Sequence, residues 1–289
     1  MGKLRAALEL TRIEHSMMLI VAVIAAELLL GGIPKPYIFI LSLITPVFIS
    51  MGAFAINDYF DIDTDRKNKK SRPLVRGDLS PSEALYITGV SMIVGIIGSA
   101  LINAQCLIIA LIFAALSLLY SYKLKDMPLI GNMYIAFSMS IPFIFGNYVL
   151  SANLSSAIAV IFVMVFFSGL AREIDGTIRD YEGDTKIRKA TTLPKLIGNF
   201  ASARIAFVLY AAAVIISIYL FYDVTPFSHN LVYALLIAIA DISLLYSGAA
   251  FVLGKKRSYD FVRNVSLAGM GLALVCVLIS SLVYIQTPF

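Results

Sequence analysis

The stretch YIFILSLITPVFISMGAFAINDYFDIDTDRKNKKSRP, residues 37–73, joins two segments of opposite character. Residues 37–56 are almost entirely apolar, and roughly 20 such residues suffice for a helix to cross the hydrocarbon core of a membrane. Four carboxylates follow between Asp58 and Asp65, and basic residues from Arg66 to Arg72 come directly after them. This arrangement predicts a dense polar site at the end of a membrane helix.

The composition of the whole chain excludes a soluble globular protein. Of the 289 residues, 60% are hydrophobic and only 14% are charged, whereas about 25% of the residues in a soluble domain are charged. The two cysteines, Cys106 and Cys276, lie in apolar surroundings and suggest neither a disulfide framework nor a zinc site. The start of the chain is not expected to be a cleavable signal peptide, because no cleavage region follows its first apolar run.

Nine apolar segments are long enough, or nearly so, to cross a membrane as helices. They cover approximately residues 14–31, 37–57, 82–102, 105–122, 129–150, 154–171, 200–221, 230–250 and 264–285. No soluble domain interrupts them, so residues 1–289 are expected to form one all-α membrane domain.

The basic residues fix the orientation of these segments. With nine spans, every Lys and Arg except Lys35 falls on one side of the membrane. Because cytoplasmic loops carry the excess of basic residues, we expect a multi-pass protein of the cell membrane with its N-terminus in the cytoplasm and its C-terminus outside. Eight or ten spans would move basic loops to the wrong side.

The first acidic cluster has a pattern that suits a helix continuing from residues 37–57. At about 100° per residue, Asn57, Asp58, Asp61 and Asp65 share one face, while Asp63 points to the opposite side. Carboxylates this close repel each other unless a cation lies among them. Oxygen ligands suit a hard cation such as Mg²⁺.

Two other interpretations of this cluster are a solvated polar loop and a calcium-binding loop. The EF-hand type of calcium loop is excluded, because Arg66 and Arg72 occupy the positions where it requires glycine and glutamate. A solvated loop is less attractive once a second acidic cluster is found on the same side of the membrane.

That second cluster is REIDGTIRDYEGD, residues 172–184. On a helix, Glu173, Thr177, Asp180 and Asp184 share one face and Asp175 points away. Basic residues follow here as well. Two acidic faces flanked by Lys and Arg have a natural common ligand in a diphosphate, which binds divalent cations through its oxygens and basic side chains through charge. The apolar bundle would then hold a hydrocarbon attached to the diphosphate.

The sequence resembles the UbiA superfamily of intramembrane prenyltransferases over nearly its whole length. The first signature, N-D-x-x-D-x-x-x-D, is matched by Asn57, Asp58, Asp61 and Asp65. The segments SRPLVRGDLS, LYSYKLKDMPLIGN and ATTLP resemble further family segments. The second signature is represented by Arg172, Glu173, Asp180, Glu182, Gly183 and Asp184. Two positions depart from the family pattern. Thr177 stands where many relatives have an aspartate, and His15 either replaces an amide ligand or caps the first helix.

The resemblance implies nine transmembrane helices around a central cavity with cytoplasmic cap loops, and Mg²⁺-dependent transfer of a prenyl group from its diphosphate. The catalytic and metal-binding residues that it implies are Asp58, Asp61, Asp65, Asp180 and Asp184. The diphosphate-binding residues that it implies are Asn57, Arg72, Lys123, Lys125, Lys186 and Lys189. We expect Mg²⁺ as cofactor and membrane lipid as the surroundings, and we expect no nucleic-acid partner. The oligomeric state stays open.

The form of the second signature and the Trp-free composition look most like the archaeal branch of the family. For this branch we expect transfer of a geranylgeranyl group to the hydroxyl of geranylgeranylglyceryl phosphate, a lipid-like acceptor. An aromatic acceptor is the alternative. Further basic residues could bind the acceptor phosphate: Lys67, Lys69, Lys70, Arg76, Arg188 and residues 255–257. A cation transporter is a third candidate, because Asp241 falls inside a predicted span.

Overall fold

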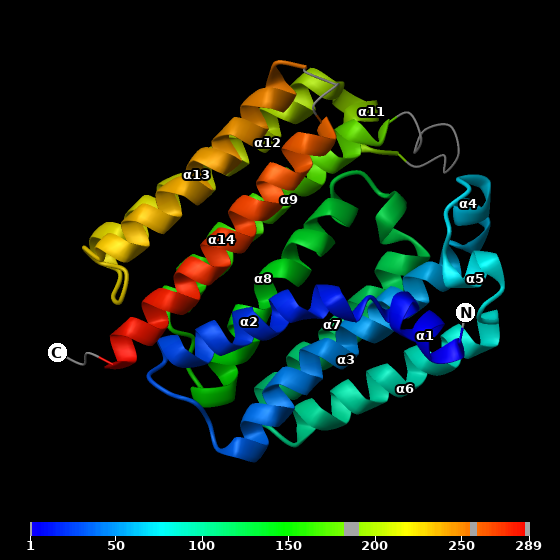
Figure 1. Ribbon diagram of the computed structural model, residues 1–289, viewed down its shortest axis with the longest axis horizontal. Helices are drawn as coiled ribbons and strands as arrows, with labels where there is room; N and C mark the ends of the chain where they lie inside the picture. Colours follow the sequence, from blue (N-terminus) through cyan, green and yellow to red (C-terminus); the bar gives the residue numbers. More distant parts are fainter. Residues whose placement is uncertain (1, 182–190, 255–258, 287–289) are drawn as a thin grey trace.

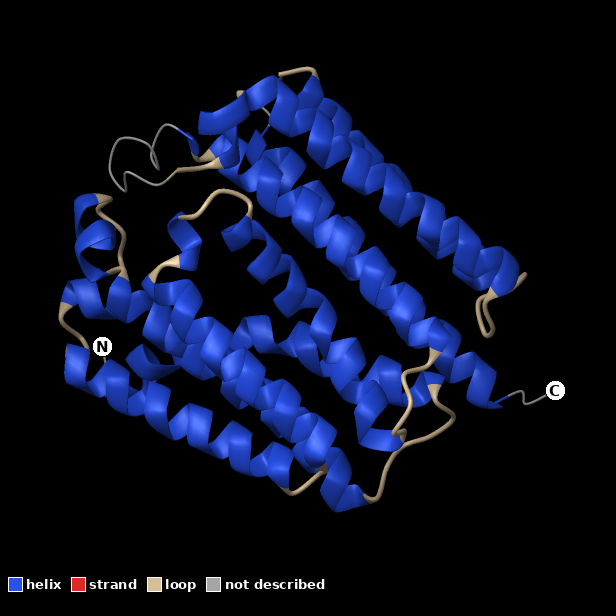
Figure 2. Ribbon diagram, turned by 180° about the vertical axis from the view of Figure 1, so that it is seen from behind, coloured by secondary structure: helices blue, strands red, loops and turns tan. Residues whose placement is uncertain are grey.

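The protein is entirely helical wherever its structure is described. The structure, a computed structural model, describes residues 2–181, 191–254 and 259–286. Every regular element in these ranges is a helix, and no strand occurs in them (Figure 2). Eight of these helices are long and apolar enough to cross a membrane by length and composition. The chain is therefore a multi-pass membrane protein.

Each of the nine predicted segments is a helix. The eight long ones are α3 (Pro36–Phe60), α6 (Pro81–Ala100), α7 (Ala104–Tyr122), α8 (Ile130–Leu150), α9 (Ser156–Arg179), α12 (Asn199–Asp223), α13 (Leu231–Val252) and α14 (Tyr259–Gln286). The ninth is α2 (Ile13–Leu29), whose 17 residues span about 25 Å at the rise of an α-helix. The predicted count of nine fits the described ranges, with α2 as the short member.

Short helices gather at one end of the bundle, which we call the acidic end (Figure 1). Within the described ranges they are α1 (Lys3–Thr11), α4 (Ile62–Lys67), α5 (Pro73–Arg76), the 3-10 helix η1 (Leu124–Asp126) and α11 (Leu193–Ile197). The long helices α3, α7 and α9 finish at this end, so the segments that follow them form a cap. The two chain termini lie at opposite ends of the molecule.

The long helices form two groups joined by a central pair. On one side α3 packs against α6 and α7, and on the other α9 packs against α12 while α13 packs against α14. Between the groups, α8 contacts α9, and α2 contacts α3, α8 and α14. The short helix α2 is therefore surrounded by helices from both groups (Figure 1).

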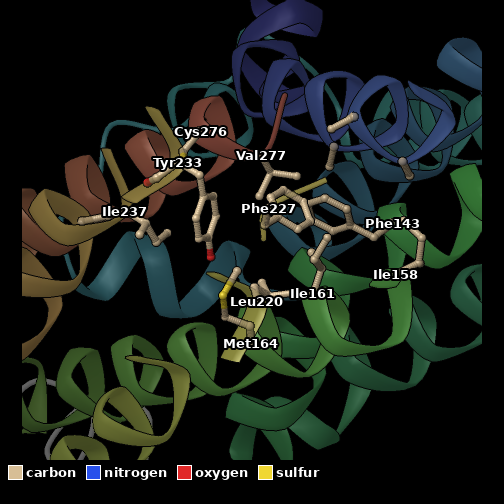
Figure 3. Close-up of a cluster of buried hydrophobic side chains, with 14 of the residues drawn as sticks. Phe143, Ile158, Ile161, Met164, Leu220, Phe227, Tyr233, Ile237, Cys276 and Val277 are labelled. Atoms are coloured by element: carbon tan, nitrogen blue, oxygen red, sulfur yellow. The ribbon is translucent and has the colours of Figure 1, made fainter. Parts of the chain in front are cut away.

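A cluster of large apolar side chains fills the end of the bundle opposite the acids, which we call the far end. Figure 3 shows the rings of Phe143 and Phe227 side by side, with Tyr233 next to them. The rings of Phe227 and Tyr233 lie 5.0 Å apart, and the Tyr233 hydroxyl donates a hydrogen bond to the carbonyl of Ser217 at 3.0 Å. Within a membrane such contacts stabilise the bundle through close packing.

The helix α1 is fixed over the end of α3 by ion pairs and by buried apolar side chains. Both terminal nitrogens of Arg76 bind Glu9, with Nη2 at 2.8 Å from Oε2. Leu10 of α1 is fully buried in a cluster that also contains Leu74 of α5. These contacts hold the end of α1, and therefore Arg12 beyond it, close to the first acidic cluster.

Candidate functional site

The first acidic cluster lies where α3 passes into α4. Asp61 alone separates the two helices; its N–H donates to the carbonyl of Asn57 at 3.0 Å, and its own carbonyl accepts from the N–H of Asp65 at 2.7 Å. These bonds carry the helical register across the junction. The side chain of Asp63 is 88% exposed, whereas that of Asp58 is 2% exposed. Asp63 therefore points away from its neighbours, as the helical spacing predicts.

Each of the three inward-facing carboxylates has a basic partner. The pairs are Arg12 Nη2 with Asp58 Oδ1 at 2.5 Å, Lys125 Nζ with Asp61 Oδ1 at 2.7 Å, and Lys70 Nζ with Asp65 Oδ1 at 3.0 Å. Arg72 Nε lies 4.0 Å from Asp65 Oδ2, and Asn57 Nδ2 donates to Asp61 Oδ2 at 3.2 Å. The predicted residues Asn57, Arg72 and Lys125 thus lie beside the predicted acids.

Arg12 belongs to this site although the sequence did not assign it a role. It joins α1 to α2 with a φ of 46°, in the left-handed region, which non-glycine residues rarely adopt. Its guanidinium lies over the ring of Phe54, 4.8 Å from the ring centre. Burial lowers the pKa of the Arg12 guanidinium below its usual value, and the carboxylate of Asp58 opposes this effect.

The turn η1 connects the two acidic segments. Lys125 of η1 is almost fully buried beside Asp61, and the carbonyl of Asp126 accepts a hydrogen bond from the N–H of Thr191 at 3.3 Å. Thr191 lies on the segment that follows α9 and the second acidic cluster. The segments after α3 and after α9 therefore meet at the same end of the bundle.

The second acidic cluster is described only in part. Asp180 follows the end of α9, is 52% exposed, and accepts two hydrogen bonds from the Arg179 guanidinium at 2.7 and 2.6 Å. The predicted residues Asp184, Lys186 and Lys189 lie outside the described residues. Asp180 therefore stands at the acidic end, and the rest of this predicted set stays a prediction.

Asp175 lies in α9, where the helical spacing places it away from the other acids of the second cluster. Its carboxyl is buried and lines a polar pocket that Glu173, Thr177 and Asp180 also line. The pocket therefore reaches around α9, and the predicted direction of Asp175, away from these residues, stays a prediction. The hydroxyl of Thr177 donates to the carbonyl of Ile174 at 2.7 Å, so the helix backbone already uses it.

Two further predictions concern Lys123 and His15. The side chain of Lys123 is exposed at the end of α7 and has no carboxylate partner in the described part of the chain. It is its neighbour Lys125 that reaches the acids.

His15 lies in the first turn of α2, but Arg12 caps that helix, so the alternative that His15 is the cap is wrong. The imidazole packs edge-on against Phe54, with ring centres 5.7 Å apart.

A cavity of about 680 Å³ opens beside the acids and runs into the bundle. Arg12, Asn57 and Arg172 line it at the acidic end, so residues of both acidic segments meet at one mouth. Deeper lining residues are mostly apolar. Tyr120 and Tyr134, stacked with ring centres 4.5 Å apart, form part of the wall near the mouth.

The far-end cluster forms part of the wall of this cavity. Phe143, Met164 and Val277 belong both to that cluster and to the cavity lining. The cavity is thus polar at its mouth and mostly apolar along its walls. Such a space suits a molecule with an anionic head and a hydrocarbon chain.

The donors at the mouth fit Mg²⁺ shared with phosphate oxygens. Within the described ranges, no three carboxylate, His or Cys side chains lie close enough to hold a metal ion by themselves. However, Asp58 Oδ2 is buried and makes no hydrogen bond within these ranges. Protein sites for Mg²⁺ commonly supply one or two carboxylates and leave the remaining positions to water and substrate phosphates, which agrees with this donor set.

Residues 18–268 of the chain match the sequence model of the UbiA prenyltransferase family. The chain belongs to this family. It is accordingly a membrane prenyltransferase, and the resemblance seen in its motifs is confirmed. The family favours an enzyme over the cation transporter. Asp241, which suggested transport, lines the cavity of this UbiA enzyme and accepts a hydrogen bond from the Ser217 hydroxyl at 2.6 Å.

Two curated relatives of this UbiA enzyme share one name. The digeranylgeranylglyceryl phosphate synthase of Archaeoglobus fulgidus is 35% identical over 278 residues, covering 94% of each chain. The synthase of the same name from Thermococcus kodakarensis is 30% identical over 284 residues, covering 96% of this chain and 99% of the relative.

Solved structures share the fold. One described as digeranylgeranylglyceryl phosphate synthase superposes with a TM-score of 0.81 at 29% identity, covering 99% of this chain and all of that one. A UbiA homologue from Archaeoglobus fulgidus, solved with GPP and Mg²⁺, superposes with a TM-score of 0.71 at 19% identity, covering 98% of this chain and all of that one. At that identity the second likeness concerns the fold alone.

Proposed function

We propose that this enzyme transfers a geranylgeranyl group from its diphosphate to the hydroxyl of geranylgeranylglyceryl phosphate, forming an ether bond of an archaeal lipid. The cavity carries the proposal: its mouth combines Asn57 of the first acidic segment with Arg172 of the second, and its interior is apolar. A diphosphate fits the mouth and a prenyl chain fits the interior. The names of the relatives support the same acceptor.

The acids at the mouth are proposed to hold Mg²⁺. Asp58, Asp61 and Asp65 would hold it from the first segment, and Asp180 and Asp184 from the second. When bound, Mg²⁺ neutralises the charge that develops on the departing diphosphate. The unpartnered oxygen of Asp58 and the oxygen-only donor set support this assignment.

The basic residues beside the acids bind and stabilise the leaving group. The bond between C1 of the prenyl chain and the diphosphate oxygen breaks, and both electrons leave with the diphosphate. Lys125 and Arg72 lie beside the acids, where their positive charges stabilise the departing diphosphate. This stabilisation is strongest in the transition state, in which the charge on the leaving group develops. The faces of Tyr120 and Tyr134 shelter the allylic cation. The acceptor oxygen then bonds to C1 and releases its proton.

The orientation follows from the same assignment. We propose that the acidic end and the N-terminus face the cytoplasm and that the C-terminus lies outside. The distribution of Lys and Arg supports this, as do the opposite positions of the two termini (Figure 1). The whole chain then forms a single prenyltransferase domain.

The choice of acceptor is tested directly. Purified protein with Mg²⁺ and geranylgeranyl diphosphate is incubated with either geranylgeranylglyceryl phosphate or 4-hydroxybenzoate, and the products are identified by mass spectrometry. We expect the double ether from the glycerol acceptor. A product from only the aromatic acid would establish the alternative, an aromatic prenyltransferase, and overturn the proposal.

A glycine beside η1 offers a test of how Lys125 is positioned. A Cβ at Gly131 would lie 3.0 Å from the carbonyl oxygen of Leu124 and 3.2 Å from Cα of Lys125. Gly131→Ala is therefore expected to displace η1 and to lower kcat/KM by about tenfold, since small misplacements of positioning groups are costly. The control is Gly89→Ala, where the added Cβ meets no atom within 4 Å. Equal activity of both variants would show that η1 does not position Lys125.

A further inference from the structure

A second pocket, which we call the polar pocket, lies at the acidic end between α9, α13 and α14. It has a volume of about 260 Å³. Among its lining residues, Arg172 and Arg263 also line the apolar cavity, so the two spaces adjoin. No described residue of α3, α4 or η1 lines the polar pocket. It therefore adjoins the proposed diphosphate site on the side of the second acidic segment, through Arg172 and Asp180, and lies apart from the first acidic segment.

The charges in the polar pocket leave one guanidinium available. Arg172 is paired with Glu173, Nη1 to Oε1, at 2.9 Å, and Arg179 is paired with Asp180. Arg263 has no carboxylate within 4 Å in the described part of the chain. Its charge acts on Glu173 only at longer range. An anion entering this pocket would meet Arg263 without first breaking an ion pair.

A buried donor of the pocket also lacks a partner. Asp175 is 4% exposed and lines the pocket, and its carboxyl interacts with the hydroxyl of the fully buried Tyr210. The buried Nε of Arg172, in contrast, makes no hydrogen bond within the described ranges. Buried polar groups are normally satisfied, so this donor indicates a space that a polar ligand or water occupies.

We propose that the polar pocket binds the phosphate and glycerol of the acceptor, with Arg263 as the main contact of the phosphate. The inference rests on the glycerol-phosphate acceptor proposed above. Arginine binds phosphate oxygens through two parallel hydrogen bonds. Because Arg263 also borders the apolar cavity, a lipid can place its head in the pocket while its hydroxyl remains near the cavity mouth. The basic residues Lys70 and Arg76 are less suited, since Asp65 and Glu9 already engage them.

The test removes the phosphate from the acceptor and the guanidinium from the enzyme in turn. Initial rates are measured with geranylgeranylglyceryl phosphate and with geranylgeranylglycerol, for the wild type and Arg263→Ala. We expect Arg263→Ala to lower kcat/KM for the phosphorylated acceptor by roughly 10- to 100-fold. The variant should change neither kcat/KM for the phosphate-free alcohol nor the KM for geranylgeranyl diphosphate. Arg263→Lys should recover part of the loss, because it keeps the charge without the planar fork.

The control is Arg204→Ala. Arg204 is an exposed arginine of α12 that lies over the ring of Phe200. It lines neither pocket, so its removal should leave kcat/KM unchanged for both acceptors. Arg263→Ala could instead lower kcat/KM equally for both acceptors, or for neither. Either result would overturn the assignment of the polar pocket to the acceptor phosphate and would leave the proposed function standing. Failure of the wild-type enzyme to alkylate either glycerol acceptor would overturn both.

Discussion

Asp61→Asn is expected to lower kcat/KM for prenyl transfer by about 10²- to 10⁴-fold. Asp61 combines contacts to Lys125 and Asn57 with a position at the junction of α3 and α4. The amide keeps the size of the side chain but removes the charge that would hold Mg²⁺ and orient Lys125. Steady-state rates of the purified enzyme with geranylgeranyl diphosphate and the glycerol acceptor measure the loss.

The matched control is Asp63→Asn, two residues away on the same helical segment. Asp63 is 88% exposed, and its nearest basic partner is Arg66 at 3.9 Å, so its removal should leave kcat/KM close to that of the wild type. Thermal unfolding of both variants in detergent shows whether they are folded. A larger loss for Asp63→Asn than for Asp61→Asn would mean that the assigned acidic face is wrong.

Removal of divalent cations is expected to abolish turnover, with a loss of about 10³-fold or more. Arg12, Lys125 and Lys70 beside the first acidic segment are engaged with Asp58, Asp61 and Asp65. They cannot by themselves neutralise a diphosphate that approaches these carboxylates. The activity of EDTA-treated protein, freed of metal by dialysis, is compared with the activity after Mg²⁺ is restored.

Binding provides a second measurement for the same prediction. A non-reactive analogue of geranylgeranyl diphosphate should raise the unfolding temperature of the enzyme only when Mg²⁺ is present, since a ligand stabilises the state that binds it. For Asp61→Asn, a higher concentration of Mg²⁺ should be needed for the same rise in unfolding temperature. Full activity of protein shown by elemental analysis to be metal-free would refute the assigned cofactor.

The spans were predictable because each is a long apolar run whose ends are marked by polar residues. The run at 37–57, for example, is part of α3 at Pro36–Phe60. The shared direction of Asp58, Asp61 and Asp65 was also predictable, because helical hydrogen bonds continue across Asp61. Local periodicity is enough to place residues that belong to one uninterrupted helical segment.

The partners of these acids could not be read from the sequence. Arg12 reaches Asp58 across 46 residues of chain, and Lys125 reaches Asp61 across 64. Both contacts depend on how α1 and η1 dock on other helices, which periodicity does not encode. Asp175 is a further example. The spacing on α9 predicts the direction of its side chain, but it does not predict the pocket that extends around that helix.

The packed far end has a consequence for where the lipid product goes. Because this end is packed with side chains such as Phe143, Phe227 and Tyr233 and the proposed chemistry belongs to the acidic end, the ether bond of the proposed function would form at the depth of one leaflet. In the proposed orientation this is the cytoplasmic leaflet. Growth of the opposite leaflet would then depend on a separate flippase.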